Sequence, residues 1–91
     1  MKQVILYGFS GPADQYRVVR YYRINGYYIS IDSIKYCAQK MKRDYPNIVH
    51  IYAIDNKFGL RQDYIDSIKK NTIESCAIFK DLLEREGLKI I

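Results

Sequence analysis

The sequence predicts an α/β domain in which about three mostly parallel strands are flanked by helices on both sides. Three observations support this prediction: strand-like and helix-like segments alternate along the chain, residues 48–54 are apolar almost without interruption, and no linker or repeat divides the 91 residues. Alternation of this kind is typical of parallel sheets with right-handed crossovers. Because a chain of this length has room for one hydrophobic core, we expect residues 1–91 to form a single domain.

The first strand is predicted over residues 3–9, which are rich in β-branched and aromatic side chains and precede the turn-forming sequence Ser10-Gly11-Pro12. Residues 13–25 are then predicted to form a helix. On a helix the three arginines of this segment would share one side, valines and tyrosines would share the other, and the Asn-Gly pair that follows would end the element.

The alternative for this segment is a strand over residues 16–24 that continues into an Asn-Gly turn. On a strand the arginines would fall on both faces instead of one. The domain would then be α+β, with an N-terminal β-hairpin and an antiparallel sheet.

A short strand over residues 27–31 and a helix after it are the next predicted elements. Either Ser30 or Asp32 can serve as the N-cap of this helix. Its apolar residues recur at steps of three and four, and Pro46 prevents it from continuing. Residues 48–54 form the strongest strand, and their near-continuous hydrophobicity predicts a central position that is covered on both faces.

After a predicted turn at residues 57–59, the chain is helical in period up to Glu86, with an apolar seam between Ile65 and Leu83. A capping box formed by Asn71 and Glu74 predicts two helices or one bent helix. Gly87 ends this region, and the residues after it predict a short tail strand. The apolar seam also predicts a homodimer through these helices.

The net charge of +5 belongs entirely to the first half of the chain: residues 1–45 contain eight Lys or Arg and three Asp, whereas residues 46–91 contain seven residues of each sign. Arginine among tyrosines is typical both of nucleic-acid sites and of protein interfaces. A solvated face that keeps the protein in solution is the plain alternative. The predicted partner-binding residues are Tyr16, Arg17, Arg20, Arg23, Lys35, Lys40, Lys42 and Arg43.

A second candidate site consists of residues that follow the predicted strands. The carboxyl ends of parallel strands share one edge of a sheet, where nucleotide-like ligands bind. The residues expected there are Ser10, Gly11, Asp32, Asp55 and Asn56. The first loop lacks the spacing of a dinucleotide or P-loop motif, and ordinary turns and helix caps explain the same residues.

Few residues of the chain are candidates for catalysis, disulfide formation or metal binding. His50 is the only histidine and falls inside the strongest strand, where a half-buried structural role is commoner than catalysis. Cys37 and Cys76 lie among apolar residues, as buried free thiols do, and a disulfide between them is the alternative. No residues have the spacing of metal ligands. We therefore predict a protein that is not an enzyme and that uses no cofactor or metal.

No apolar stretch approaches the roughly 18 residues of a membrane span, and the apolar run at the N-terminus is too short for a signal peptide. The sequence therefore predicts a cytoplasmic protein without a membrane partner.

The leading functional hypothesis is a small regulator, inhibitor or adaptor that binds a protein partner through its basic, tyrosine-rich face. The Lys-, Ile-, Tyr- and Asn-rich composition resembles that of small proteins encoded by phages and mobile elements, and this resemblance implies a regulator or inhibitor. Nucleic-acid binding by the same face is the first alternative. A nucleotide-like ligand at the second candidate site is the other.

Overall fold

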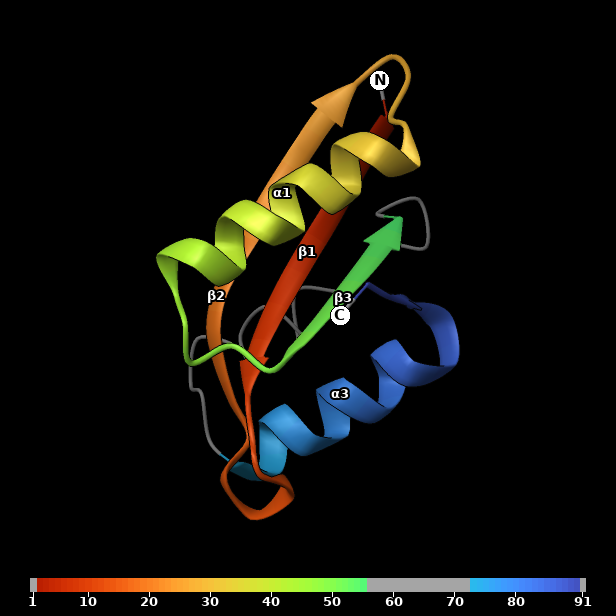
Figure 1. Cartoon of the computed structure of the whole chain (residues 1–91). Helices are drawn as coiled ribbons and strands as arrows, with labels where there is room; N and C mark the ends of the chain where they lie inside the picture. Colours follow the sequence, from red (N-terminus) through yellow and green to blue (C-terminus); the bar gives the residue numbers. More distant parts are fainter. Residues whose placement is uncertain (1, 56–72, 91) are drawn as a thin grey trace.

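The computed structural model describes residues 2–55 and 73–90, which contain a four-stranded sheet (Figure 1). The strands lie in the order β2-β1-β3-β4, and every neighbouring pair is antiparallel. Helix α1 packs on one face of the sheet and helix α3 on the other. The fold is therefore α+β. The prediction of a mostly parallel α/β domain is wrong, and the hairpin alternative is closer.

Strands β1 (Lys2–Ser10) and β2 (Arg17–Gly26) form an antiparallel hairpin. The helix predicted over residues 13–25 is wrong, since only Ala13–Gln15 is helical, as one 3-10 turn. The strand prevails because pairing with β1 satisfies main-chain groups along the segment, and because valine and tyrosine favour a pleated surface. Gly26, expected just beyond the end of a helix, is the last residue of β2.

Helix α1 (Ile31–Asp44) confirms the helix predicted to precede Pro46. Ser30 is its N-cap, since the Ser30 Oγ accepts a hydrogen bond from the main-chain N–H of Ser33 at 3.1 Å. The strand predicted over residues 27–31 is wrong. The Ser30 cap starts the helix at residue 31, and residues 27–30 form no regular element.

The Ser30→Ala variant is expected to lose about 1 kcal/mol of unfolding free energy, because the N–H of Ser33 then lacks a side-chain acceptor. Urea denaturation followed by circular dichroism measures this loss. Ser33→Ala is the matched control, since it keeps the capped N–H and should cost less. Equal losses in the two variants would contradict the capping role of Ser30.

Strand β3 (His50–Asp55) lies between β1 and β4 (Leu88–Lys89), so the predicted central position is confirmed, although the strand begins at His50 and not at residue 48. Helix α3 (Ile73–Glu86) precedes Gly87 and the tail strand, as the sequence predicts. A β-carbon at Gly87 would lie 2.6 Å from the carbonyl oxygen of Leu83, so the reversal from α3 into β4 requires glycine. The predicted capping box at Asn71 lies outside the described residues.

The hydrophobic core consists of two clusters that the sheet separates. Alternate residues of β1 and β3 enter each cluster, because successive side chains of a strand point to opposite faces. The α3-side cluster contains Ile5, Tyr7, Phe9, Tyr52, Ile54, Cys76, Phe79 and Leu83. The α1-side cluster contains Leu6, Ile34, Ala38, Met41, Ile48, Ile51 and Ala53. Strand β1 therefore runs through the middle of the core, whereas none of the ten residues of β2 is buried.

Candidate interaction surface

The arginines predicted to bind a partner lie on β2, which is the last strand at one edge of the described sheet. Arg17, Arg20 and Arg23 are all exposed. The prediction that they share one helix face is wrong. Arg20 and Arg23 are three positions apart and lie on opposite faces of the strand, whereas the register shift between Gly8 and Phe9 places Arg17 on the face of Arg20.

The pairing register assigns two of these arginines to opposite faces of the sheet. Arg20 lies opposite Gly8, where a β-carbon would touch Met41 of the α1-side cluster. Arg23 lies opposite Ile5 of the α3-side cluster. The edge formed by β2 is therefore flanked by a cationic group on each face.

Each of these arginines lies over a tyrosine of its own strand. The Cζ atom of Arg20 is 5.8 Å from the centre of the Tyr22 ring, and the Cζ atom of Arg23 is 5.8 Å from that of Tyr21. Residues two apart on a strand share a face, which brings each pair together. A cation–π contact at an exposed site is worth about 0.5–1 kcal/mol, enough to restrict where each guanidinium group points.

Tyr22 also connects the edge strand with the last turn of α1. Burial, followed by the nearby carboxylate of Asp44, raises the pKa of the Tyr22 phenol. Asp44 in turn lies 3.8 Å from the Nε atom of Arg43. The carboxyl end of α1, which includes Arg43, therefore lies beside β2.

The predicted lysines of α1 divide between two flanks of the helix. At about 100° per residue, Lys40 falls on the flank of Asp44, which faces β2, while Lys35 and Lys42 fall on the opposite flank. All three lysines are exposed. The structure therefore brings Lys40 toward the strand arginines and places Lys35 and Lys42 away from them.

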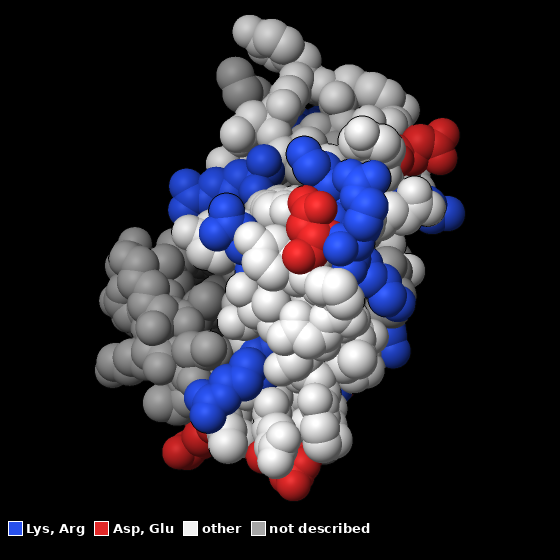
Figure 2. All heavy atoms as spheres, turned by 60° about the vertical axis from the view of Figure 1, so that its left-hand side comes forward, with Lys and Arg blue, Asp and Glu red and all other residues white. Residues whose placement is uncertain are grey.

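We use the name β2–α1 surface for the residues that meet at this edge. Figure 2 brings the β2 side of the molecule forward and shows Lys and Arg side chains gathered on this face, with acidic atoms between them. The surface consists of Arg20, Tyr21, Tyr22, Arg23, Lys40 and Arg43.

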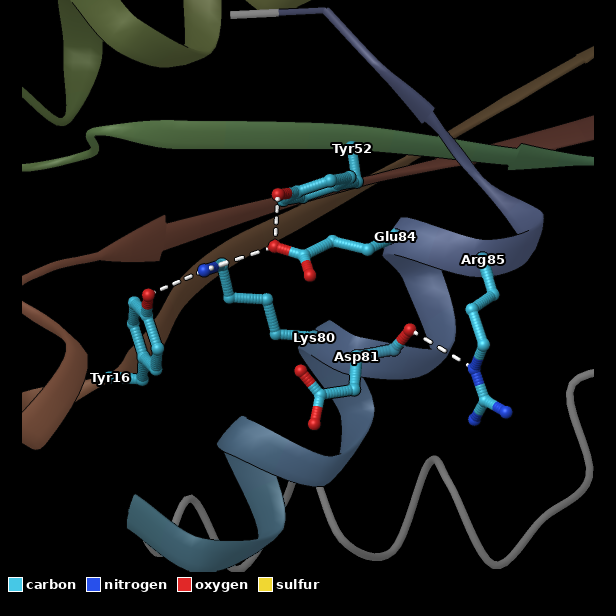
Figure 3. A network of polar contacts seen from close by, with 6 residues as sticks. All are labelled: Tyr16, Tyr52, Lys80, Asp81, Glu84 and Arg85. Atoms are coloured by element: carbon cyan, nitrogen blue, oxygen red, sulfur yellow. Dashed lines mark hydrogen bonds and ion pairs between the residues drawn. The ribbon is translucent and has the colours of Figure 1, made fainter.

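Tyr16 lies apart from these residues, in a polar network that sequence reasoning missed (Figure 3). The Tyr16 hydroxyl accepts a hydrogen bond from the ammonium group of Lys80, which also lies 4.0 Å from the centre of the Tyr16 ring. Lys80 forms an ion pair with Glu84 at 3.2 Å, and the hydroxyl of Tyr52 donates to the same carboxylate at 3.1 Å. The network joins the start of β2 to β3 and α3.

The charges of this network stabilise one another. Burial lowers the pKa of Lys80, which is 8% exposed, but the hydrogen bonds with Tyr16 and Glu84 outweigh burial, and the net effect raises its pKa. The hydrogen bond from Lys80, followed by that from Tyr52, lowers the pKa of Glu84. The sequence carries one signal for this pair, since Lys80 and Glu84 are four residues apart on a helix.

His50 borders the network, with its ring centre 6.1 Å from that of Tyr16 and 6.4 Å from that of Tyr52. Its Nδ1 atom is buried and has no hydrogen-bond partner in the described part of the chain. Burial, followed by the charge of Lys80, lowers the pKa of His50 and favours the neutral ring. The half-buried position agrees with the prediction for this residue.

The second candidate site is divided, because Ser10 and Gly11 lie far from Asp55. Because β1 and β3 are antiparallel, Asp55 lies opposite Val4 near the start of β1, whereas Ser10 and Gly11 lie at its far end. Asp32 lies in the first turn of α1, and Asn56 lies outside the described residues. A pocket of about 240 Å³ is lined by Lys2, Val4, Ile29, Ile34, Ala53, Ile54, Asp55 and Leu88. Among the described residues of the predicted site, Asp55 alone lines it.

The two cysteines lie on opposite faces of the sheet. The cysteines are free thiols, with Cys37 packed on the α1-side cluster and Cys76 buried on the other side.

The described residues include no group of three or more His, Cys, Asp or Glu that could hold a metal ion. None of their helices is long and apolar enough to cross a membrane.

The part of the predicted dimer seam that lies in α3 packs inside this chain. Phe79 and Leu83 are buried in the α3-side cluster, while Ile65 and Ile68 lie outside the described residues. Ile78 remains 59% exposed on the outer side of α3. A homodimer through these helices stays a prediction.

Known proteins give no family for the chain. Comparison with family models, with curated proteins and with solved structures finds no match, so the function is inferred from the residues of the β2–α1 surface.

Proposed function

We propose that this chain is a non-enzymatic binding module, a regulator, inhibitor or adaptor that holds an acidic protein partner on the β2–α1 surface. The observation that carries the proposal is the pair of exposed arginines on an edge strand, each supported by a tyrosine ring. Arginine and tyrosine are among the residues most enriched where protein interfaces gain their binding energy. Lys40 and Arg43 extend the positive charge onto α1, which favours a partner with carboxylates.

The internal polar network supports a non-enzymatic role. Nucleophiles and general bases act through side chains that can reach a substrate. The ammonium group of Lys80 is instead held by Tyr16 and Glu84, and Lys80 itself is buried. The hydrogen-bonding capacity of this network is thus directed toward joining α3 to the sheet.

The placement of the tyrosines favours a protein partner over a nucleic acid. Binding of single strands relies on bases that stack on open aromatic faces. Arg20 and Arg23 already lie over the rings of Tyr22 and Tyr21. The two guanidinium groups also lie on opposite faces of the sheet, whereas a nucleic-acid backbone would follow one face.

The test is capture of a protein partner from lysate by the purified chain and by two double variants, each of which lacks two positive charges. Arg20→Ala with Arg23→Ala should weaken capture at least tenfold. Lys35→Ala with Lys42→Ala removes the same charge from the far flank of α1 and should leave capture unchanged. Equal weakening in both double variants would contradict the proposed site, because it would indicate attraction by net charge alone.

Fluorescence anisotropy with labelled single-stranded DNA and RNA tests the alternative. Nucleic-acid binding would weaken steeply with salt, with a log–log slope of about −0.7 for each single-strand phosphate contacted. We expect no such binding at physiological salt. Micromolar, salt-sensitive binding that depends on Arg20 and Arg23 would replace the protein partner with a nucleic acid.

A further inference from the structure

The main chain of β2 has a side that faces away from the sheet. Phe9 accepts a hydrogen bond at its carbonyl from the N–H of Val49, so Phe9 directs its main-chain groups toward β3. These directions alternate along an antiparallel strand. Leu6 and Val4 therefore direct their main-chain groups toward β2.

The register then identifies the outward groups of β2. Leu6 pairs with Tyr22, and Val4 pairs with Ile24. The residues of β2 that alternate with Tyr22 and Ile24 direct their N–H and C=O groups away from β1. These residues are Tyr21, Arg23 and Asn25.

These outward groups lie on an accessible part of the strand. Tyr21, Arg23 and Asn25 are exposed, and no main-chain hydrogen bond links them to another part of the described chain at this edge. An exposed strand edge of this kind is a template for a further strand. Extended peptides bind such edges through main-chain hydrogen bonds, and side-chain contacts supply the specificity.

We infer that the partner contributes an extended acidic segment that pairs with residues 20–25 of β2 and adds a fifth strand to the described sheet. The inference rests on the function proposed above and specifies how the partner is held. The charge of the edge argues for acidic side chains in that segment. It argues against a second copy of this chain, because two paired β2 edges would gather the arginines of both copies along one seam.

The positions of the arginines specify the spacing of the acidic residues. Side chains directly opposite on paired strands lie on the same face of the sheet. Arg20 and Arg23 are three positions apart and lie on opposite faces. A segment with acidic residues at positions i and i+3 therefore meets both arginines, whereas a segment with acidic residues at i and i+2 meets only one.

Two synthetic peptides of equal composition test this spacing. Each has about ten residues, the length of a long strand, with two glutamates in a Thr- and Val-rich sequence. One has the glutamates at i and i+3, and its isomer has them at i and i+2. Fluorescence anisotropy should show that the first binds at least tenfold more tightly, and that Arg20→Ala with Arg23→Ala abolishes this preference. Equal affinities for the two peptides would overturn the inference.

N-methylation of the peptide tests the main-chain pairing. The glutamate opposite Arg23 directs its amide toward β2, and the glutamate opposite Arg20 directs its amide to solvent. Methylation at the glutamate opposite Arg23 should therefore weaken binding at least tenfold. Methylation at the glutamate opposite Arg20 should leave binding unchanged. Equal effects at both positions would overturn strand pairing.

The two proposals fail separately. If neither peptide binds while capture of a partner still requires Arg20 and Arg23, strand addition is wrong and the proposed surface stands. If capture does not depend on these arginines, the proposed function is wrong as well. Circular dichroism of the arginine variant confirms that a loss of binding is not a loss of folding.

Discussion

The Phe79→Ala variant is expected to lose about 3–5 kcal/mol of unfolding free energy, the usual cost of deleting a large buried aromatic side chain. Phe79 is 1% exposed at the centre of the α3-side cluster. Its ring centre lies 4.8 Å from that of Tyr7 in an edge-to-face contact and 6.1 Å from that of Phe9. Because small domains are stable by only about 5–15 kcal/mol, the loss should leave α3 barely attached to the sheet.

Urea denaturation followed by far-ultraviolet circular dichroism measures this effect. Ile78→Ala is the matched control, since Ile78 is the preceding residue of the same helix and is largely exposed. A surface substitution of this kind should change stability by no more than about 0.5 kcal/mol. Similar losses in the two variants would contradict the packing of α3 through Phe79.

The Lys80→Met variant is expected to lose about 1–3 kcal/mol at neutral pH. Methionine keeps the apolar stem of the side chain but removes the donor that Tyr16 and Glu84 share. Glu84 is about half exposed and is hydrated by water in the variant, so the cost should lie below that of breaking a fully buried ion pair. The start of β2 should loosen, because its contact with α3 through Tyr16 is weakened.

The dependence of stability on pH supplies a second measurement of this variant. The hydrogen bond from Lys80 is the main reason that the pKa of Glu84 is lowered in the folded chain. A lowered carboxyl pKa stabilises the fold above the unfolded value of about 4.3, and this stability is lost as the pH falls through the folded value. The loss of stability in acid should therefore be shallower in Lys80→Met. An unchanged stability and acid profile would contradict the role of Lys80.

His50 also makes the unfolding free energy depend on pH, in a higher pH range than Glu84 does. Its lowered pKa means that the unfolded chain takes up a proton before the folded chain does. The stability from His50 is complete above about pH 6.5 and is lost as the pH falls from there toward the folded pKa. This part of the profile should remain in Lys80→Met, although reduced, because burial is the larger cause of the shift.

The fold could be predicted from the sequence where a segment fits one periodicity. Residues 31–44 carry apolar side chains at helical steps and follow the N-cap residue Ser30, and the segment around His50–Asp55 fits the strand period alone. Residues 16–24 fit both periods, since arginines at every third position make a helix face and alternating side chains make a strand. Pairing with β1 decides between them, and this long-range contact leaves no local trace in the sequence. The error in strand direction follows from that one segment.

The candidate site could be predicted in composition but not in arrangement. The arginines of β2 are exposed, as the charge of the first half suggested, but the strand divides them between two faces. The helical period places Lys40 and Lys42 on different flanks of α1, but only the packing of α1 shows which flank faces β2. The contact between Tyr16 and Lys80 joins residues 64 positions apart, which is beyond any local pattern.

Because β1 is central, its amides provide an internal reference for hydrogen exchange in this chain. The amides of β1 are directed toward a neighbouring strand on each side and lie beneath both helices, so they exchange with deuterium only when the whole sheet opens. The outward amides of Tyr21, Arg23 and Asn25 exchange without any opening. A single deuterium experiment can therefore distinguish a partner that covers the edge from a partner that merely stabilises the fold: the first slows the amides of β2, and the second slows those of β1.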